Sequence, residues 1–244
     1  MTRFEEEVFD FLQHFGTVEV ADGPDHFFRV GGKTFVPKSI LNHNEGQTGI
    51  PIWEDLWNNK RDILTGRISA VLGKAKRFHA RETCVEKVDK LLAREFAEAH
   101  HLMGFAGGKV HLALKRGGNT LSVMSFGKKC PVEREGQTFE SVEIIRYCTS
   151  SGTAVVGGLS KLLSHFSKQY PSDDLMTYVD AEWSEGDGFR KFGFEEIDRT
   201  EPQKFLVDPQ SMKRYLKHEF HYAPESCVSI FNQGSIKLVK YFDK

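Results

Sequence analysis

Hydrophobic positions in the middle of the chain change from the period of a strand to the period of a helix. In residues 142–149 the polar Glu143 and Arg146 stand between apolar neighbours, as in a strand, whereas the apolar residues of 159–166 recur as on one face of a helix. A glycine-bearing loop is predicted over 150–158, and a second strand over 174–180. A helix that begins directly after such a loop points free backbone N–H groups towards an anion. This segment therefore predicts an anion site.

The surrounding pattern predicts an α+β domain. A helix is expected over residues 85–99, with Val88, Leu91, Leu92 and Phe96 on one face. The Gly-Gly pair at 117–118 suits the tight turn of a hairpin. The remaining expected elements are a strand at 78–83, hairpin strands at 110–115 and 120–126, a short helix at 187–192, strands at 194–198 and 204–207, and a helix with one or two strands within 211–244.

The N-terminal part predicts a smaller module with its own helix and hairpin. Residues 4–15 carry helical spacing, and strands are expected at 18–21, 26–30 and 33–36, with Gly31 and Gly32 forming the last turn. Residues 38–51 have turn composition, 52–57 are apolar and acidic, and a basic helix follows over about 58–73, with Gly73 as its C-cap. Four parts are thus predicted: a small module at 1–57, a basic linker helix at 58–77, the α+β domain at 78–210, and an extension at 211–244 that packs on that domain.

Composition limits the class of protein. With 244 residues, 39% of them hydrophobic and 20 of them Phe, the chain can build a sizeable core. No apolar run approaches the roughly 20 residues of a membrane span, and the N-terminus shows no secretory signal. The four cysteines, at 84, 130, 148 and 227, lack CxxC spacing, which favours neither a disulfide framework nor a zinc knuckle. We expect a cytoplasmic protein with no membrane partner.

The net charge of −1 conceals strongly charged blocks. Residues 58–81 hold seven bases and one acid, whereas 171–201 hold ten acids and three bases. A concentrated basic segment in a neutral chain can bind the phosphates of nucleic acid, although a solvated helix face explains it equally well. The candidate DNA contacts are Lys60, Arg61, Arg67, Lys74, Lys76, Arg77 and Arg81, together with Trp183, which could stack on a base or simply pack.

The order of elements across residues 142–194 resembles the acyl-CoA-binding half of the GNAT acyltransferase fold. That resemblance implies a mixed central sheet with two splayed strands, an acyl-CoA cofactor such as acetyl-CoA, and a pyrophosphate held by backbone N–H groups. A side chain in place of glycine would block the phosphate; the alternative is that the glycines only let the helix pack close to the sheet. The implied cofactor-binding residues are Val155, Val156, Gly157, Gly158, Leu159 and Ser160.

Two positions depart from the GNAT pattern. The family usually has Arg or Gln before its glycine loop, where Thr153 or Ala154 stands here. In many GNAT enzymes a tyrosine protonates the departing thiolate, and Phe189 occupies that place, with no proton to give.

The run 52–208 also resembles the C-terminal half of phage homing or very-short-patch-repair-like endonucleases. The carboxylate pair that holds a metal in those nucleases is missing here, so metal-dependent nuclease activity is not expected and no metal site is predicted. Asp25, Glu45, Glu54 and Asp55 are the acids that could still assemble one. The matching pieces are 52–57, 67–73, 79–81, 100–104, 122–127, 143–148, 155–163, 178–180 and 191–194.

A further resemblance is to the family of the phage DNA-modification protein Mom. It implies that His100 or His101 removes a proton and that Arg146 and Asp180 orient the reacting groups. Each residue also has a structural alternative. The histidines lie where a helix C-terminus favours positive charge, and Arg146 and Asp180 could form an ion pair across adjacent strands.

These patterns leave three functions open. The leading hypothesis is a phage or mobile-element transferase in a bacterial host, which places an acyl group on a base amine of DNA drawn out of the duplex. The second is a conventional N-acyltransferase for a small molecule or protein. The third is a DNA-binding relic without chemistry. The donor, the acceptor and the oligomeric state stay open.

Overall fold

The chain divides into two compact units. The computed structural model describes residues 1–21, 26–42, 48–134 and 136–242. Unit 1 comprises Met1–Lys74, Ala181–Trp183 and Glu201–Gly234, and unit 2 comprises Ala75–Asp180, Ser184–Thr200 and Ser235–Lys244. Each unit is thus assembled from three stretches of sequence.

Unit 1 begins with a helix and a four-stranded sheet. Helix α1 (Arg3–Gln13) starts at Thr2, whose hydroxyl accepts from the Glu5 N–H at 3.3 Å, and it buries Phe4, Val8 and Leu12. The sheet has the order β1-β2-β3-β4, with only the β3–β4 pair parallel. Its strands are Glu19–Ala21, Phe27–Val30, Lys33–Lys38 and Ile50–Trp53. The predicted helix and first three strands are confirmed.

The rest of unit 1 follows β4 and returns late in the chain. Helices α2 (Glu54–Asn59) and α3 (Arg61–Val71) come first, and α3 ends before Gly73, whose φ of 70° marks a left-handed C-cap. A three-stranded sheet of order β15-β14-β16 is formed by Arg214–Tyr215, Lys204–Val207 and Val228–Phe231. The helix expected within 211–244 is the 3-10 helix η2 (Lys217–Tyr222).

Unit 2 is built on one large mixed sheet. Its order is β13-β17-β12-β10-β8-β7-β6, with β9 paired to β10, and all pairs are antiparallel except β10–β12. A separate parallel pair joins β11 to β5. In chain order the strands are β5 (Lys76–His79), β6 (Cys84–Lys87), β7 (Val110–Arg116), β8 (Asn119–Phe126), β9 (Cys130–Arg134), β10 (Gln137–Thr149), β11 (Thr153–Val156), β12 (Asp174–Asp180), β13 (Glu195–Arg199) and β17 (Ser235–Tyr241).

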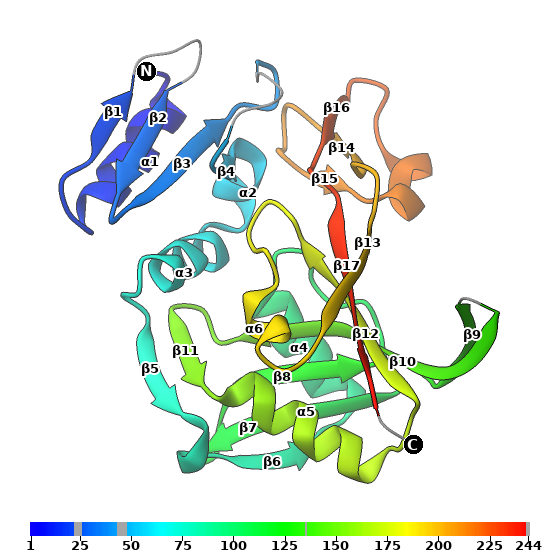
Figure 1. The fold of residues 1–244 in the computed structure, drawn as a ribbon. Helices are drawn as coiled ribbons and strands as arrows, with labels where there is room; N and C mark the ends of the chain where they lie inside the picture. Colours follow the sequence, from blue (N-terminus) through cyan, green and yellow to red (C-terminus); the bar gives the residue numbers. More distant parts are fainter. Residues whose placement is uncertain (22–25, 43–47, 135, 243–244) are drawn as a thin grey trace. The chain divides into compact units, whose positions relative to one another are not determined.

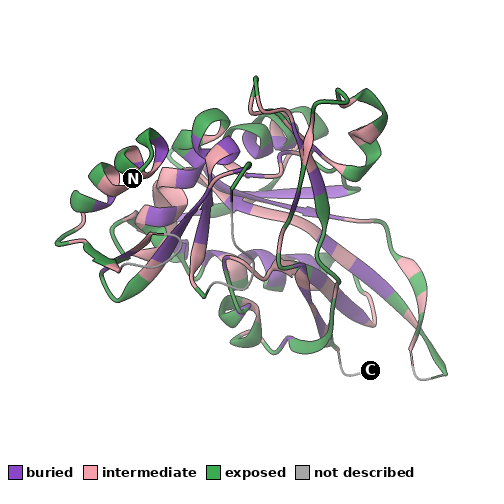
Figure 2. Cartoon of the chain, turned by 90° about the horizontal axis from the view of Figure 1, so that it is seen from above, coloured by how far each residue is buried: buried purple, intermediate pink, exposed green. Residues whose placement is uncertain are grey.

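Helices cover both faces of this sheet (Figure 1). On one face, Phe166 of α5 (Gly158–Gln169) stacks on Phe126 of β8, with 3.7 Å between ring centroids. On the other, Ala93 and Phe96 of α4 (Lys90–His100) pack against a cluster that includes Val123 of β8. Val123 and Phe126 lie an odd number of residues apart, so their side chains point to opposite faces. Figure 2 shows that the buried positions follow the central strands. Two shorter helices complete the unit, η1 (Ala80–Glu82) and α6 (Asp187–Arg190).

The helix predicted over 85–99 was placed too early. Residues Cys84–Lys87 form β6, paired with β7, and α4 begins after Asp89, whose carboxylate accepts from the Leu92 N–H at 2.8 Å. Leu91, expected on the buried face, is 64% exposed. The prediction was wrong because it used the helical spacing of apolar residues alone. Aspartate is a preferred N-cap residue, and Asp89 therefore marks the start of the helix. The strand predicted at 78–83 likewise divides into β5 and η1.

Candidate functional site

The parallel strands β10 and β12 part halfway along their length. Ser141–Ile144 pair with Asp174–Thr177, and no further register pair joins the two strands in the described part of the chain. A bulge falls at this point in β10, between Ile144 and Arg146. Beyond it, β10 continues on β8 up to Thr149, and β12 continues on β17 up to Asp180. The two strands therefore diverge beyond these pairs, which is the opening that the resemblance to the GNAT fold implies.

The first turn of α5 follows this opening along the chain. Gly157 precedes the helix in a left-handed conformation, with φ of 77°, and no side chain caps the helix start. The first bond into the helix is from the Lys161 N–H to the Gly157 carbonyl at 3.0 Å. Within the described chain, the N–H groups of Gly158, Leu159 and Ser160 donate to no protein acceptor. Free donors at the positive end of a helix fit a phosphate.

The two glycines have different reasons to be glycine. The left-handed backbone of Gly157 disfavours a side chain at the helix start. A Cβ on Gly158 would lie 3.0 Å from the Cβ of Val155 and 3.1 Å from Cδ1 of Leu114, so close packing explains this glycine. Thr153, near the usual basic position, donates instead to the Ser150 carbonyl at 2.6 Å. The free N–H groups of Gly158, Leu159 and Ser160, called the cradle below, can therefore hold the diphosphate of an acyl-CoA through backbone atoms alone.

Arg146 and Asp180 occur in the diverging stretches, but no ion pair between them is found among the described residues. The Nε of Arg146 donates to the Gly104 carbonyl at 3.2 Å, and its Nη1 donates to the Ile145 carbonyl at 2.9 Å. Burial lowers the pKa of Arg146, which the nearby charge of Glu143 partly offsets. The ion pair was one of two alternatives from the sequence, and the contacts found for Arg146 go to backbone carbonyls.

His100 and His101 mark the end of α4, as predicted. The Ser151 N–H donates to Nδ1 of His100 at 3.2 Å, so the neutral ring carries its proton on Nε2. Burial lowers the pKa of His100. The Met103 N–H donates to Nδ1 of His101 at 3.1 Å. These contacts attach the end of α4 to Ser151 and Met103, and the role of either ring in removing a proton stays a prediction.

Phe189 packs where the resemblance implies a proton donor. Its ring meets that of Phe194 edge-on, with centroids 5.2 Å apart. Nearby, a Cβ on Gly188 of α6 would come within 3.5 Å of Cδ2 of Leu159. The short helix α6 thus lies against the first turn of α5, where an apolar ring contributes packing and no proton.

The predicted DNA-binding residues divide between the units. Arg61 pairs with Glu7 at 2.8 Å, and the guanidinium of Arg67 lies 4.5 Å from the ring centre of Trp183, which is 9% exposed. The packing alternative thus accounts for Trp183. Lys60, Arg61, Arg67, Lys74 and Trp183 belong to unit 1, whereas Lys76, Arg77 and Arg81 belong to unit 2.

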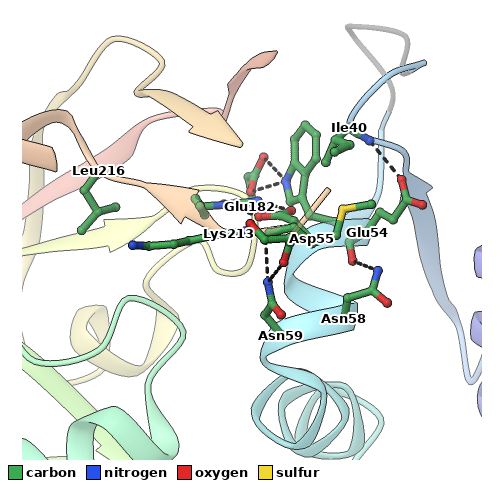
Figure 3. Close-up of polar contacts among 12 residues, drawn as sticks. Ile40, Glu54, Asp55, Asn58, Asn59, Glu182, Lys213 and Leu216 are labelled. Atoms are coloured by element: carbon green, nitrogen blue, oxygen red, sulfur yellow. Dashed lines mark hydrogen bonds and ion pairs between the residues drawn. The ribbon is translucent and has the colours of Figure 1, made fainter. Parts of the chain in front are cut away.

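Two of the four acids that could have held a nuclease metal have other contacts. Asp55 pairs with Arg214, and Glu54 accepts from the Ser39 hydroxyl and the Ile40 N–H (Figure 3). Asp25 and Glu45 lie outside the described residues. In the described chain, no three His, Cys, Asp or Glu residues gather as metal ligands.

Unit 2 also contains a buried polar pair, His111 and Ser125, that the sequence did not predict. His111 of β7 and Ser125 of β8 are register partners, with 2.8 Å between Nδ1 and Oγ. Burial lowers the pKa of His111, and the charge of Lys90 adds to this effect. A Cβ on Gly108 would come within 2.7 Å of Cε1 of His111, so glycine is needed beside the ring. Strand periodicity, which places His111 on the same face as buried Ala113, was the available signal.

The sheet order, the bulge and the strand opening together decide the fold. Unit 2 has a GNAT-like fold. Structural comparison gives similar architectures: an IAA acetyltransferase from Bacillus cereus ATCC 14579 is 14% identical with a TM-score of 0.35, covering 66% of this chain and 99% of that one. Arabidopsis thaliana Naa50, solved with a CoA bisubstrate analogue, is 13% identical with a TM-score of 0.42, again over 66% and 99%. The Escherichia coli ribosomal-protein-S18-alanine N-acetyltransferase is 10% identical with a TM-score of 0.40, over 66% and 95%.

These likenesses identify no substrate, and the fold assignment rests on the topology of unit 2 itself. No protein-family model and no curated protein matches the chain. The resemblance to the Mom family and to the endonucleases therefore stays a prediction. None of the helices in the described chain is long and apolar enough to cross a bilayer.

Proposed function

We propose that unit 2 is an acyl-CoA-dependent N-acyltransferase that modifies a primary amine. The observation that supports it best is the conjunction of two features: the opening between β10 and β12, and the free N–H groups at the start of α5. The amides of Gly158, Leu159 and Ser160 would hold the diphosphate, which leaves the opening for the thioester and the amine. Acyl-CoA, when bound, supplies an acyl group on a thioester.

In the proposed reaction the C–N bond forms while the C–S bond and one N–H bond break. The nitrogen of the neutral amine forms the C–N bond, the electrons of the C–S bond leave with sulfur, and the proton that the nitrogen loses passes through solvent to the thiolate. A thiol has a pKa of about 8.5, so its thiolate can depart near neutral pH without a proton donor. Phe189 at the usual tyrosine position is therefore compatible with transfer. The role of this chain is to bind and orient the reactants.

A charge substitution in the cradle tests this function. Ser160→Asp places a carboxylate in the first turn of α5, which favours the helix dipole but repels a diphosphate. We expect folding stability to be kept and the thermal shift caused by acetyl-CoA to be lost. Ser164→Asp, on an exposed position of the same helix, is the matched control. An unchanged acetyl-CoA shift in Ser160→Asp, or no shift in the wild type with any acyl-CoA, would contradict the proposal.

A base amine of DNA is the competing acceptor, and the same purified protein can be used to test for DNA binding. The leading sequence hypothesis predicts retention of DNA at low salt, with affinity that falls as salt rises because Lys and Arg release counterions. It also predicts a modified nucleoside in cells that express the protein, which mass spectrometry of digested DNA would detect. A conventional N-acyltransferase binds acetyl-CoA and shows neither effect.

A further inference from the structure

Arg146 differs from the two other arginines that are deeply placed in this protein. Arg134 and Arg214 have side chains that are 11% exposed, and each faces a fully buried aspartate. Arg146 is also withdrawn from solvent, far enough for burial to lower its pKa, yet it forms no ion pair with any described carboxylate. The charge of Glu143 offsets only part of the cost of this burial, and an anionic ligand would compensate the rest.

The position of Arg146 shows where such a ligand would come from. Arg146 follows the bulge in β10, in the stretch that has parted from β12, and pairs with Ser125 on the side away from the opening. Two of its three nitrogens are held by carbonyls, so the guanidinium is fixed in place, whereas Nη2 donates to no described residue. The residue is thus a fixed donor beside the opening.

The chemistry of the Arg146 guanidinium limits the kinds of ligand that can bind there. A guanidinium is planar and permanently charged, and it matches a carboxylate in a paired arrangement of hydrogen bonds. The opening spans residues 178–180 on β12, which at about 3.3 Å per residue is a length of about 10 Å. A small molecule fits this length.

We propose that Arg146 binds the carboxylate of the acceptor, so that the substrate class is amino acids or similar small amines that carry a carboxylate. This inference rests on the function proposed above, because it names the acceptor for the same opening. The carboxylate adds to the partial compensation by Glu143, and the amine of the same molecule then lies beside the diverging strands.

Direct binding tests the inference without an acyl donor. The probes are N-acetyl amino acids, which resemble the product, and the matching N-acetyl amino acid amides, which lack the charge. We expect only the acids to raise the melting temperature of the wild type, and Arg146→Gln to remove that shift. Arg94→Gln is the matched control and should keep the shift, because Arg94 of α4 places its guanidinium over the ring of Phe105.

Transfer kinetics supply the second readout. With acetyl-CoA as donor, the wild type should acetylate amino acids with a kcat/KM about 10- to 100-fold above that for their amides, the loss expected for one charged hydrogen-bond partner. In Arg146→Gln the preference should vanish through a raised KM for the acceptor, while the acetyl-CoA thermal shift shows that the variant still folds. Arg146→Lys should recover only part of the preference, because a lysine lacks the planar geometry.

Three outcomes would overturn the inference: a wild type that binds acids and amides alike, an Arg146→Gln variant that keeps the preference for acids, or Arg146-dependent binding of phosphoethanolamine in place of carboxylates. Failure of the function itself has a different signature. In that case acetyl-CoA would cause no thermal shift in the wild type, whatever the acceptor panel shows.

Discussion

Among the described residues, each unit contains one buried arginine–aspartate pair with the same side-chain exposure, but the two pairs join residues at very different separations in the sequence. In unit 2, Arg134 of β9 meets Asp174 of β12, 40 residues away. In unit 1, Arg214 of β15 meets Asp55 of α2, 159 residues away, with both bonds at 2.7 and 2.8 Å. The same kind of ion pair therefore attaches the β9–β10 hairpin to β12 in unit 2, and connects residues far apart in the sequence in unit 1.

The contacts around each ion pair show the same difference in sequence separation. Arg134 sits on the β9–β10 hairpin, and the Ser141 hydroxyl joins it on Asp174. In unit 1, Asn59 donates to the carbonyls of Ser211 and Met212, and the indole of Trp53 donates to Glu182 (Figure 3). In unit 1 these side-chain contacts join stretches that are far apart in the sequence, whereas in unit 2 strand pairing with β17 joins such stretches.

The largest effect is expected when each pair is broken by removal of its acid. Asp55→Ala leaves Arg214 buried and uncompensated, which should cost about 3–5 kcal/mol of unfolding free energy. Asp174→Ala should cost less, about 1–3 kcal/mol, because the hairpin that carries Arg134 can move towards water. All three tryptophans, Trp53, Trp57 and Trp183, belong to unit 1, so their fluorescence during denaturant unfolding reports that unit. Hydrogen exchange of β12 amides reports the other.

A second substitution shows whether the charge itself is responsible. Arg214→Met combined with Asp55→Ala removes the stranded cation and keeps an apolar stem beside Phe205. The double variant should be more stable than Asp55→Ala alone. Equal loss in the single and double variants would mean that the connection depends on packing and not on the ion pair.

The same contrast explains what could be predicted from the sequence. In unit 2 the strand and helix periods are local, and they correctly predicted β8, α5, β12 and residues 142–149 of β10, whereas the opening between the strands was implied by the resemblance to the GNAT fold. The start of α4 was wrong because one capping residue, Asp89, outweighed a plausible helical face. The contacts of Asp55 and Trp183 in unit 1 could not be predicted, because their partners carry no periodic signal and lie far away or on another element.

Within the candidate site, backbone features were predictable and side-chain partners were not. The glycine before α5 and the free amides follow from local sequence, as does the position of Arg146 on a strand. The missing acid for Arg146 and the buried His111–Ser125 pair depend on how neighbouring strands align and where they separate. A single sequence does not contain that register.

A smaller effect, the response to pH, should separate the units further. Burial lowers the pKa values of His100 and His111 in unit 2 from an ordinary value of 6.5. The unfolded chain therefore binds more protons, so this contribution is complete above about pH 6.5 and is lost as the pH falls through the lowered values. In unit 1, hydrogen bonds from Trp57 and Arg61 lower the pKa of Glu7, so its contribution is lost only below about pH 4.5.

Unfolding at pH 7 and pH 5 measures this difference. We expect hydrogen exchange in the core strands of unit 2 to accelerate at pH 5, after correction for the intrinsic exchange rate. His111→Gln should reduce that pH dependence, because a glutamine does not titrate and can still hydrogen bond to Ser125. His14→Gln, at the exposed end of α1, controls for the loss of a histidine. Unchanged pH dependence in His111→Gln would exclude this residue as a source.

The smallest effect is expected at the hairpin turns, where the units should behave alike. Gly32 of unit 1 and Gly118 of unit 2 have φ values of 71° and 84°, and a Cβ at either position would meet no described atom within 4 Å. The cost of Gly→Ala at each turn therefore comes from the left-handed backbone alone, about 1–2 kcal/mol. Asn should cost less, because it tolerates this conformation. Tryptophan fluorescence for Gly32→Ala and exchange of β7 and β8 amides for Gly118→Ala should give similar losses. A clearly larger loss of stability for Gly32→Ala would contradict this expectation. It would mean that the hairpin of unit 1 depends on contacts with distant parts of the sequence, as the Arg214–Asp55 pair does.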